Sequence, residues 1–322
     1  MKPAPDLCPW LPEALGSVQQ LLIDSVQDMP GGYKRDIEAL ITAGGKRLRP
    51  KLVLVSGRLG MPDMQKLTRL AAGIELLHTA TLIHDDVIDN AKTRRGIPSL
   101  QTLFSAREAV ISGDYLLAKS LSLLHSVLGA GSTDDFLQGI LHICRSELLQ
   151  HASRFNPDAG LRSYNRRIAG KTAALFVLSC YCGGIEGKLD ESGMQGLRRY
   201  GYSLGMAFQI IDDILDISGN PKDLQKPALQ DMRQGIYTLP VLLAMGKDPS
   251  AKAMIGRYAR RQKAVPAGKL KAVLTAANAL DEAYGVANRY MACGMKALAQ
   301  LPGSDEKEYL QRLIESLSKR IS

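Results

Sequence analysis

The stretch Leu82–Asp89 reads Leu-Ile-His-Asp-Asp-Val-Ile-Asp and closes an apolar run, 74–88, whose hydrophobic residues recur at helical spacing. Asp85 and Asp89 are four residues apart, so on a helix they lie on one face, one turn from each other. Like charges at that spacing repel, so we expect a positive species to compensate them. Carboxylate oxygens suit Mg²⁺, which prefers one or two carboxylates together with phosphate oxygens and water.

The same pattern occurs a second time. Phe208–Asp216 reads Phe-Gln-Ile-Ile-Asp-Asp-Ile-Leu-Asp, again at the end of an apolar helical run. One such motif alone is equally well a solvated helix end, but two copies embedded in apolar sequence are hard to explain in that way. Two carboxylate clusters that face one cavity would hold roughly two or three Mg²⁺ ions, and these ions would bind a diphosphate.

Length and composition set the broad class. A chain of 322 residues is one large domain or two average ones, and 45% apolar with 23% charged residues is ordinary for a globular protein. The five cysteines are scattered and predict neither a zinc site nor a disulfide framework, so we expect a reducing compartment. The N-terminus lacks the apolar core of a signal peptide, and the longest nearly apolar run, 173–181, is too short to span a bilayer. A cytoplasmic location is therefore expected.

The net charge of +9 is compatible with nucleic acid, a membrane surface or a polyanionic ligand. Aromatic residues make up only 5% of the chain, and no basic stripe is interleaved with them, which argues against a nucleic-acid platform. Diphosphate substrates and peripheral contact with an anionic membrane remain.

Almost every segment has a helical pattern, and strand-like alternation is absent, so the sequence predicts an all-α fold. Ser105 and Glu108 form a capping box that opens a long helix. A helix is expected from Ser163 to Cys182, closed by Gly183-Gly184, and another over 267–299. Lys171 falls within an apolar helical face, where a charge is costly without an anion.

Basic residues gather at two further places. Lys46 and Arg49 surround a glycine turn at a helix start, which is either an anion site or a solvated basic turn. His78 precedes Asp85 by seven residues and shares its face, as a structural residue or as a ligand. The adjacent arginines at 94–95 follow the first acidic cluster, where they form surface ion pairs or grip phosphates bidentately.

Taken together, these motifs resemble the trans-polyprenyl diphosphate synthases over roughly residues 15 to 320. The motifs that carry the resemblance are Gly44-Gly45-Lys46-Arg47-Leu48-Arg49-Pro50, His84-Asp85-Asp86-Val87-Ile88-Asp89, Arg94-Arg95-Gly96, Gly113-Asp114-Tyr115, Gly170-Lys171-Thr172, Phe208-Gln209 with Asp212-Asp213 and Asp216, and Lys226-Pro227. The resemblance implies a single all-α domain over residues 1–322, a bundle of about ten or more helices around a central cavity. It also implies a homodimer, with a heterodimer containing a small subunit left open.

The resemblance also implies a role for each matching residue. Mg²⁺ would be bound by Asp85, Asp89 and Asp212, assisted by Asp86, Asp213 and Asp216. The diphosphate of isopentenyl diphosphate would be bound by Lys46, Arg49, His78 and Arg95. The allylic diphosphate would be bound by Arg94, Lys171, Thr172, Gln209 and Lys226. Two departures stand out: Gln225 occupies a position where the family often has glycine, and Ile236 replaces a lysine of the short-chain members.

We expect product length to depend on residues one turn before Asp85. Ala80 and Thr81 lie roughly 6–8 Å from the metal end of the helix, the reach of one or two isoprene units, and Leu77 forms the next layer. Short-chain relatives place bulky aromatic residues there. The small residues predict a long product of roughly 30 to 40 carbons for a quinone side chain, with a farnesyl or geranylgeranyl diphosphate synthase as the alternative. Ala80 could instead serve only close helix packing.

Other function classes fit less well. A metal phosphohydrolase, suggested by His84-Asp85, needs further paired histidines, and the chain has five histidines with no matching pair. Terpene cyclases and head-to-head prenyl synthases typically lack the Gly-Gly-Lys-x-x-Arg motif that begins at Gly44. A non-catalytic partner subunit would lack one aspartate cluster, and both clusters are intact.

Overall fold

The computed structural model describes residues 7–43, 45–94, 96–218 and 229–320. The prediction of an all-α fold is confirmed, because helices form almost all of the regular structure. The described strands form a single hairpin of two residues in each strand, β1 (Thr93–Arg94) and β2 (Ile97–Pro98). The chain divides into two compact units. Unit 1 is the chain up to Leu137 with Leu175–Arg198 and Leu298–Arg312; unit 2 is Gln138–Ala174, Arg199–Ala297 and the chain from Leu313. One domain over residues 1–322 stays a prediction.

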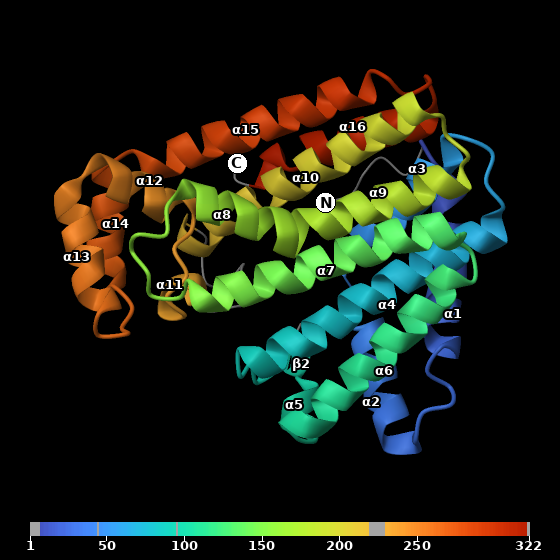
Figure 1. Ribbon diagram of the computed structural model, residues 1–322, viewed down its shortest axis with the longest axis horizontal. Helices are drawn as coiled ribbons and strands as arrows, with labels where there is room; N and C mark the ends of the chain where they lie inside the picture. Colours follow the sequence, from blue (N-terminus) through green and yellow to red (C-terminus); the bar gives the residue numbers. More distant parts are fainter. Residues whose placement is uncertain (1–6, 44, 95, 219–228, 321–322) are drawn as a thin grey trace. The chain divides into compact units, whose positions relative to one another are not determined.

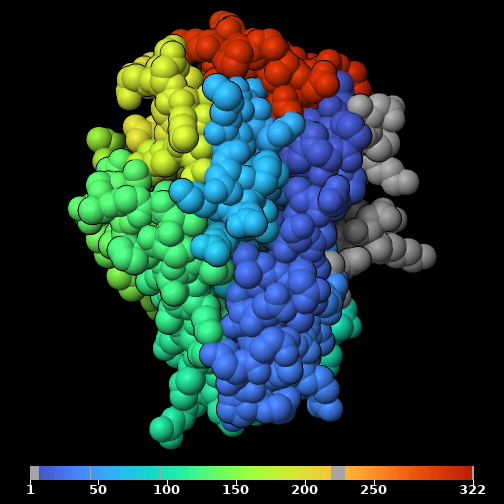
Figure 2. All heavy atoms as spheres, turned by 90° about the vertical axis from the view of Figure 1, so that its right-hand side faces the viewer, coloured from blue at the N-terminus to red at the C-terminus, as the bar shows by residue number. Residues whose placement is uncertain are grey.

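Unit 1 is built around α4 (Met64–Ile88), which is buried on nearly all sides between Leu67 and Ile83. Asp63 starts this helix by accepting hydrogen bonds from the backbone nitrogens of Gln65 and Lys66, at 2.8 and 3.2 Å. Helices α1, α3, α5 and α6 all contact α4. The other helices are α1 (Leu11–Asp24), α2 (Gly31–Thr42), α3 (Leu48–Arg58), α5 (Leu100–Leu103), α6 (Ala106–His125), α9 (Ala174–Glu186) and the parts of α7 (Ala130–Ala152), α10 (Glu191–Ser218) and α16 (Asp305–Glu315) that fall in this unit. In the space-filling view, α1 and α2 form a continuous blue band on the surface (Figure 2).

Helices α4 and α6 lie along each other (Figure 1). The predicted capping box opens α6, since the Ser105 hydroxyl accepts a bond from the Glu108 backbone nitrogen at 3.2 Å. Two glycines allow the close approach: a Cβ on Gly73 would lie 2.7 Å from Leu124, and one on Gly113 would lie 2.3 Å from the His84 ring. The contact at Gly113 holds the end of α4 that carries the first aspartate cluster.

The expectation that Gly183-Gly184 ends a helix is wrong, because α9 continues to Glu186. A Cβ on Gly183 would lie 2.3 Å from the Val53 carbonyl oxygen of α3, and one on Gly184 would lie 2.6 Å from the Met194 sulfur. These glycines therefore serve close helix packing within unit 1 instead of chain termination.

Unit 2 contains the second aspartate cluster, at the end of α10. The remaining helices are α8 (Leu161–Ile168), the π-helical turn η1 (Ala169–Ala173), α11 (Gln230–Arg233), α12 (Leu239–Lys247), α13 (Pro249–Ala259), α14 (Ala267–Ala276), α15 (Ala279–Leu298) and the 3₁₀ turn η2 (Ser318–Arg320). The single helix expected over 267–299 is in fact two helices, because Asn278 adopts a left-handed conformation (φ 47°) that ends the regular hydrogen-bond pattern.

One helical stretch within the described residues, Leu161–Glu186, is long and apolar enough to cross a membrane by length and composition alone. Of its most apolar window, 72% is buried inside the protein. Because buried core helices have the same composition, this stretch is weak evidence for a membrane span.

Candidate active site

The first aspartate cluster occupies the last turn of α4. Asp85 and Asp89 are half-buried there, and no basic residue lies in the last turn of the helix. The helix dipole adds a partial negative charge at this end, so the two carboxylates and the dipole together favour a cation. The second cluster repeats this arrangement, with half-buried Asp212 and Asp216 near the end of α10, where the last turn also lacks a basic residue.

The middle aspartate of the first cluster has a different environment. Asp86 is buried, and Arg94 of β1 donates through Nε to both carboxylate oxygens at 2.9 and 3.1 Å and through Nη2 to Oδ1. Such a two-pronged, charge-assisted ion pair fixes the two side chains relative to each other. Asp86 therefore holds the loop after α4, and Arg94, expected at the allylic diphosphate, pairs with Asp86 in this structure.

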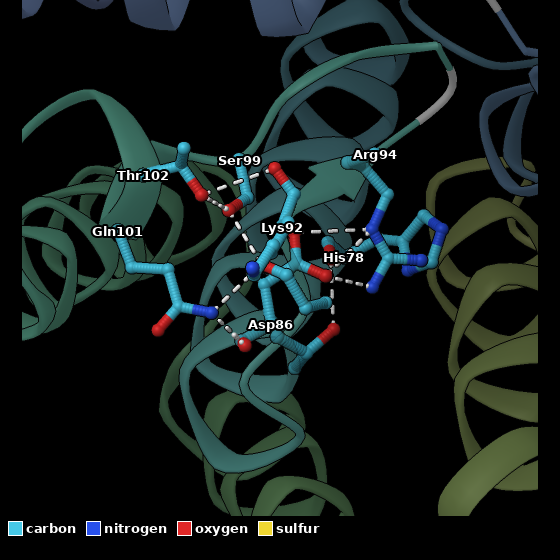
Figure 3. Close-up of polar contacts among 9 residues, drawn as sticks. His78, Asp86, Lys92, Arg94, Ser99, Gln101 and Thr102 are labelled. Atoms are coloured by element: carbon cyan, nitrogen blue, oxygen red, sulfur yellow. Dashed lines mark hydrogen bonds and ion pairs between the residues drawn. The ribbon is translucent and has the colours of Figure 1, made fainter.

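Three polar residues of the following segment complete the loop (Figure 3). Gln101 donates from Nε2 to the carbonyl oxygens of Asp86 and Ala91, at 2.6 and 2.7 Å. The hydroxyls of Ser99 and Thr102 donate to the carbonyls of Ala91 and Lys92, at 2.6 and 3.0 Å. Gln101 and Arg94 approach the end of α4 from opposite sides (Figure 3). The sequence did not identify these contacts, since the partners are backbone carbonyls.

Asp86→Ala should lower the free energy of unfolding by about 3 kcal/mol, because it leaves the largely buried Arg94 guanidinium without its carboxylate. Urea denaturation measures this loss. Asp158→Ala serves as the control, since Asp158 pairs with Lys252 on the surface, where an ion pair contributes at most about 1 kcal/mol. Equal losses in the two variants would contradict the assigned role of Asp86.

The residues expected to bind isopentenyl diphosphate lie in unit 1. Arg49 donates through Nη1 to His78 Nε2 at 3.0 Å, which requires a neutral His78 with its proton on Nδ1. The Arg49 guanidinium also stacks on Phe176, 5.1 Å from the ring centre. Lys46 is exposed in the segment before α3. Arg95 lies outside the described residues.

The neighbouring Arg47 has a structural role. Its backbone is left-handed (φ 46°), and its side chain forms a largely buried ion pair with Glu75 of α4 at 2.6 Å. It also donates to Gln19 Oε1 at 2.8 Å. The arginine in the middle of the basic turn thus anchors the turn to α4 and leaves Lys46 and Arg49 as its candidates for an anion.

In unit 2, Arg320 of η2 contacts the first aspartate of the second cluster. Its Nη2 lies 2.6 Å from Asp212 Oδ1, and its guanidinium stacks on Phe208 at 4.9 Å. The side chain of Asp216 accepts a long bond from the backbone nitrogen of Gln230 at 3.4 Å. A cation therefore already lies beside Asp212, as expected where negative charge accumulates.

The middle aspartate of this cluster is also held within the protein. Asp213 is 2% exposed and accepts bonds from the Tyr164 hydroxyl at 2.7 Å and from Gln209 Nε2 at 2.8 Å. Burial and the nearby Asp231 carboxylate raise the pKa of Asp213 to about 7. Gln209 in turn accepts a bond from the Thr172 hydroxyl at 2.6 Å. The predicted residues Thr172, Gln209 and Asp213 are thus brought together.

Lys171 lies in the π-helical turn η1, a distortion that is often found at functional sites. Its Nζ lies 2.9 Å from Glu147 Oε1 of α7, and Gln150 donates to the same oxygen at 2.8 Å. Gly170 is required here, because a Cβ would overlap the Ser146 hydroxyl. Sequence reasoning missed Glu147, Tyr164 and Arg320. Lys226 and Gln225 lie outside the described residues.

The donor set fits a divalent cation that retains outer ligands. Within the described ranges, no three His, Cys, Asp or Glu side chains gather closely enough to hold a metal ion by themselves. Mg²⁺ commonly binds through one or two carboxylates and takes its other ligands from phosphate and water, so a carboxylate pair at a helix end is a suitable partial site. That the two clusters face one cavity stays a prediction.

The residues expected to limit product length lie on α4. Ala80 and Leu77 are buried, and Thr81 is half-buried, with its hydroxyl donating to the His78 carbonyl at 2.8 Å. Their role in product length stays a prediction.

Comparison with known proteins agrees with this site. Residues 32–276 match the family described as polyprenyl synthetase. Component 2 of heptaprenyl diphosphate synthase from Geobacillus stearothermophilus is 35% identical over 311 residues, 97% of each chain. The structure of geranylgeranyl pyrophosphate synthase from Lactobacillus brevis has a TM-score of 0.89 at 32% identity, over 98% of this chain and 100% of the other.

The structure of a polyprenyl synthase from Caulobacter crescentus, complexed with calcium and isoprenyl diphosphate, has a TM-score of 0.91. It is 30% identical and covers 98% of this chain and 97% of its own. The family match spans more than half of the chain, and both aspartate clusters and the Lys46–Pro50 turn lie within it. The chain therefore belongs to the polyprenyl synthetase family and is a prenyltransferase.

Proposed function

We propose that this prenyltransferase condenses isopentenyl diphosphate with an allylic diphosphate, head to tail and in trans geometry, in a Mg²⁺-dependent reaction. The observation that carries the proposal is that each unit combines a carboxylate pair at a negative helix end with cations suited to a diphosphate. Unit 1 has Asp85 and Asp89 at the end of α4, with the cation Arg49 of α3, which is hydrogen-bonded to His78 of α4. Unit 2 has Asp212 and Asp216 at the end of α10 and Lys171 in η1.

Lys171, together with Thr172 and Gln209, would bind the allylic diphosphate and stabilise the negative charge that develops as its C–O bond breaks. Bound Mg²⁺ would supply further neutralisation of the diphosphate leaving group. Arg49, His78 and Lys46 would hold isopentenyl diphosphate so that its double bond attacks the allylic carbon, forming the new C–C bond. A proton then leaves the adduct and is taken up by the departing diphosphate, so no protein base is required.

Arg49→Ala should raise KM for isopentenyl diphosphate about 10- to 100-fold, and Lys171→Ala should do so for the allylic substrate, because each cation neutralises a different diphosphate. Steady-state kinetics with one substrate varied at a time measure both effects. Arg58→Ala and Lys252→Ala, which each remove an exposed cation, serve as controls and should leave both KM values unchanged. If Arg49→Ala and Lys171→Ala impaired the same substrate equally, the two assignments would be wrong.

The proposed product is an all-trans chain of roughly 30 to 40 carbons, used as a quinone side chain and made in the cytoplasm. The small residues at 80–81 support this length, because they leave the path along the helix open to a growing chain. The similarity to a component of heptaprenyl diphosphate synthase supports it as well. The similar geranylgeranyl pyrophosphate synthase keeps a shorter product as the second candidate.

A second subunit is part of the proposal. On α7, the side chains of Leu141 and Leu148 are 59 and 73% exposed and lie seven residues apart on one helix face. Exposed apolar residues on one face are typical of an interaction surface. The similar protein from Geobacillus stearothermophilus is named component 2 of its enzyme, which supports assembly with a second chain. That second chain is either another copy of this protein or a small subunit.

The direct test is to incubate the purified protein with radiolabelled isopentenyl diphosphate, each allylic primer in turn, and Mg²⁺, and to separate the products by chromatography. A long product from the protein alone, with a sedimentation mass of two chains, would support a homodimer. Activity that requires added small subunit would support the heterodimer. No elongation under either condition, or elongation that persists fully in EDTA, would refute the proposed reaction.

A further inference from the structure

Tyr164 is a buried tyrosine whose hydroxyl is directed at the second aspartate cluster. It lies on α8, is 1% exposed, and donates to Asp213 Oδ2 at 2.7 Å. Burial and the Asp213 carboxylate raise the pKa of Tyr164 well above its usual value, so the phenol keeps its proton and acts as a donor. Arg167, one turn further along α8, stacks on the ring at 5.3 Å and donates to the Tyr237 carbonyl at 3.1 Å.

The second oxygen of Asp213 is held by a side chain of fixed orientation. The Thr172 hydroxyl donates to Gln209 Oε1 at 2.6 Å, which directs the Gln209 amide nitrogen toward Asp213 Oδ1, at 2.8 Å. A chain of three hydrogen bonds therefore runs from Tyr164 on α8, through Asp213 and Gln209 on α10, to Thr172 in η1. Both ends of this chain of hydrogen bonds, Tyr164 and Thr172, lie on the continuous α8–η1 segment. They hold α10 at Asp213 and Gln209, two residues that are one turn apart on α10.

This chain sets the rotation of α10 about its own axis. Successive residues of a helix differ by about 100° in direction, so a fixed Asp213 determines where Asp212 and Asp216 project. Asp212 and Asp216 are half-buried, whereas Asp213 is 2% exposed and has a donor on each oxygen. Asp213 thus anchors the helix, and Asp212 and Asp216 are the less buried carboxylates of the cluster.

We propose that Tyr164 is a positioning residue of the second metal site, acting through Asp213 to direct Asp212 and Asp216 toward the metal and the allylic diphosphate. The inference rests on the proposed Mg²⁺-dependent reaction. It assigns a function to a residue outside the sequence motifs, and it predicts that Asp213 contributes to metal binding by orientation instead of by ligation.

The chain offers a matched control for the loss of one tyrosine hydroxyl. Tyr181 is 5% exposed, and its hydroxyl donates to Asp135 at 2.7 Å, the same distance as in the Tyr164 pair. Asp135 is in neither aspartate cluster. Tyr181→Phe therefore removes a tyrosine–carboxylate hydrogen bond of the same length, to an exposed aspartate, without affecting a candidate metal ligand.

The experiment compares Tyr164→Phe, Tyr181→Phe and wild type by titration with Mn²⁺ in the presence of inorganic diphosphate, with free Mn²⁺ followed by electron paramagnetic resonance. This readout involves no turnover. Tyr164→Phe should weaken Mn²⁺ binding about tenfold, lower kcat, and leave KM for isopentenyl diphosphate unchanged, since that substrate is assigned to Arg49. Tyr181→Phe should bind Mn²⁺ as wild type does. Unchanged Mn²⁺ binding in Tyr164→Phe would overturn the inference.

Asp213→Asn provides a second test that keeps the shape of the side chain and the oxygen that accepts from Tyr164, and loses the acceptor for Gln209. If Asp213 only orients the helix, Asp213→Asn should weaken Mn²⁺ binding far less than Asp212→Asn, and its effect should not add to that of Tyr164→Phe. Equal losses in Asp213→Asn and Asp212→Asn would make Asp213 a ligand and refute the inference. Absence of elongation by the wild-type protein would instead refute the proposed function, so the two failures are distinguishable.

Discussion

Replacing Asp85 or Asp212 with alanine should lower kcat about 10²- to 10⁴-fold while the protein stays folded, because each change removes charge that, in the proposed reaction, would hold Mg²⁺ and stabilise the leaving diphosphate. Both carboxylates are half-buried at the negative end of a helix, so their removal relieves repulsion. In the Asp212 variant, loss of the ion pair with Arg320 offsets part of this relief. Steady-state rates at saturating Mg²⁺ and thermal unfolding measure the two expectations separately.

Asp158→Ala is the control for this prediction, since it removes a surface carboxylate paired with Lys252 and should leave kcat unchanged. The Asp212 variant also removes the ion pair with Arg320, so Arg320→Ala is measured beside it to separate loss of the carboxylate from loss of the pair. Wild-type activity in either aspartate variant would remove that residue from the proposed metal site.

Ala80→Phe should shorten the product from roughly 30–40 carbons toward 15 or 20, because a ring about 6–8 Å from the metal end blocks the growing chain after its first units. Product chromatography with excess isopentenyl diphosphate measures the change. Ala80 is 1% exposed, so a phenylalanine there also risks overpacking, which costs about 1–3 kcal/mol.

Because Ala80→Phe risks overpacking, Thr81→Phe serves as a second variant. Thr81 is half-buried and better able to accept a larger side chain. Its control is Thr68→Phe, because Thr68 is also half-buried on α4 and its hydroxyl likewise bonds a carbonyl of the preceding turn. Thr68 lies about 20 Å along the helix from Thr81 and should leave product length unchanged. Only 15- or 20-carbon products from the wild-type protein, supplied with any required subunit, would overturn the long-chain proposal.

The periodicity of apolar residues was sufficient to predict the all-α class and the two helices that carry the aspartate clusters. The pattern before Asp85 and the pattern before Asp212 each correspond to a single long helix, and the capping residue Ser105 was predictable because capping depends on neighbours in sequence. The two errors at helix ends have different causes. Gly183 lies within a helix and allows a close approach to Val53, and a contact between segments so distant in the chain leaves no periodic signal. Asn278 ends α14 through its left-handed backbone, a single-residue feature that apolar periodicity does not reveal.

The sequence by itself determined the family, the helical class and the residue types of the candidate site, because charge, spacing and apolar periodicity are local properties. Only the tertiary structure separated the aspartates within each cluster, burying Asp86 against Arg94 and Asp213 against Tyr164 while leaving the outer aspartates half-buried. The physical reason is that the availability of a carboxylate for a metal depends on its burial and its donors. For Asp213 one of those donors lies 49 residues away, on another helix.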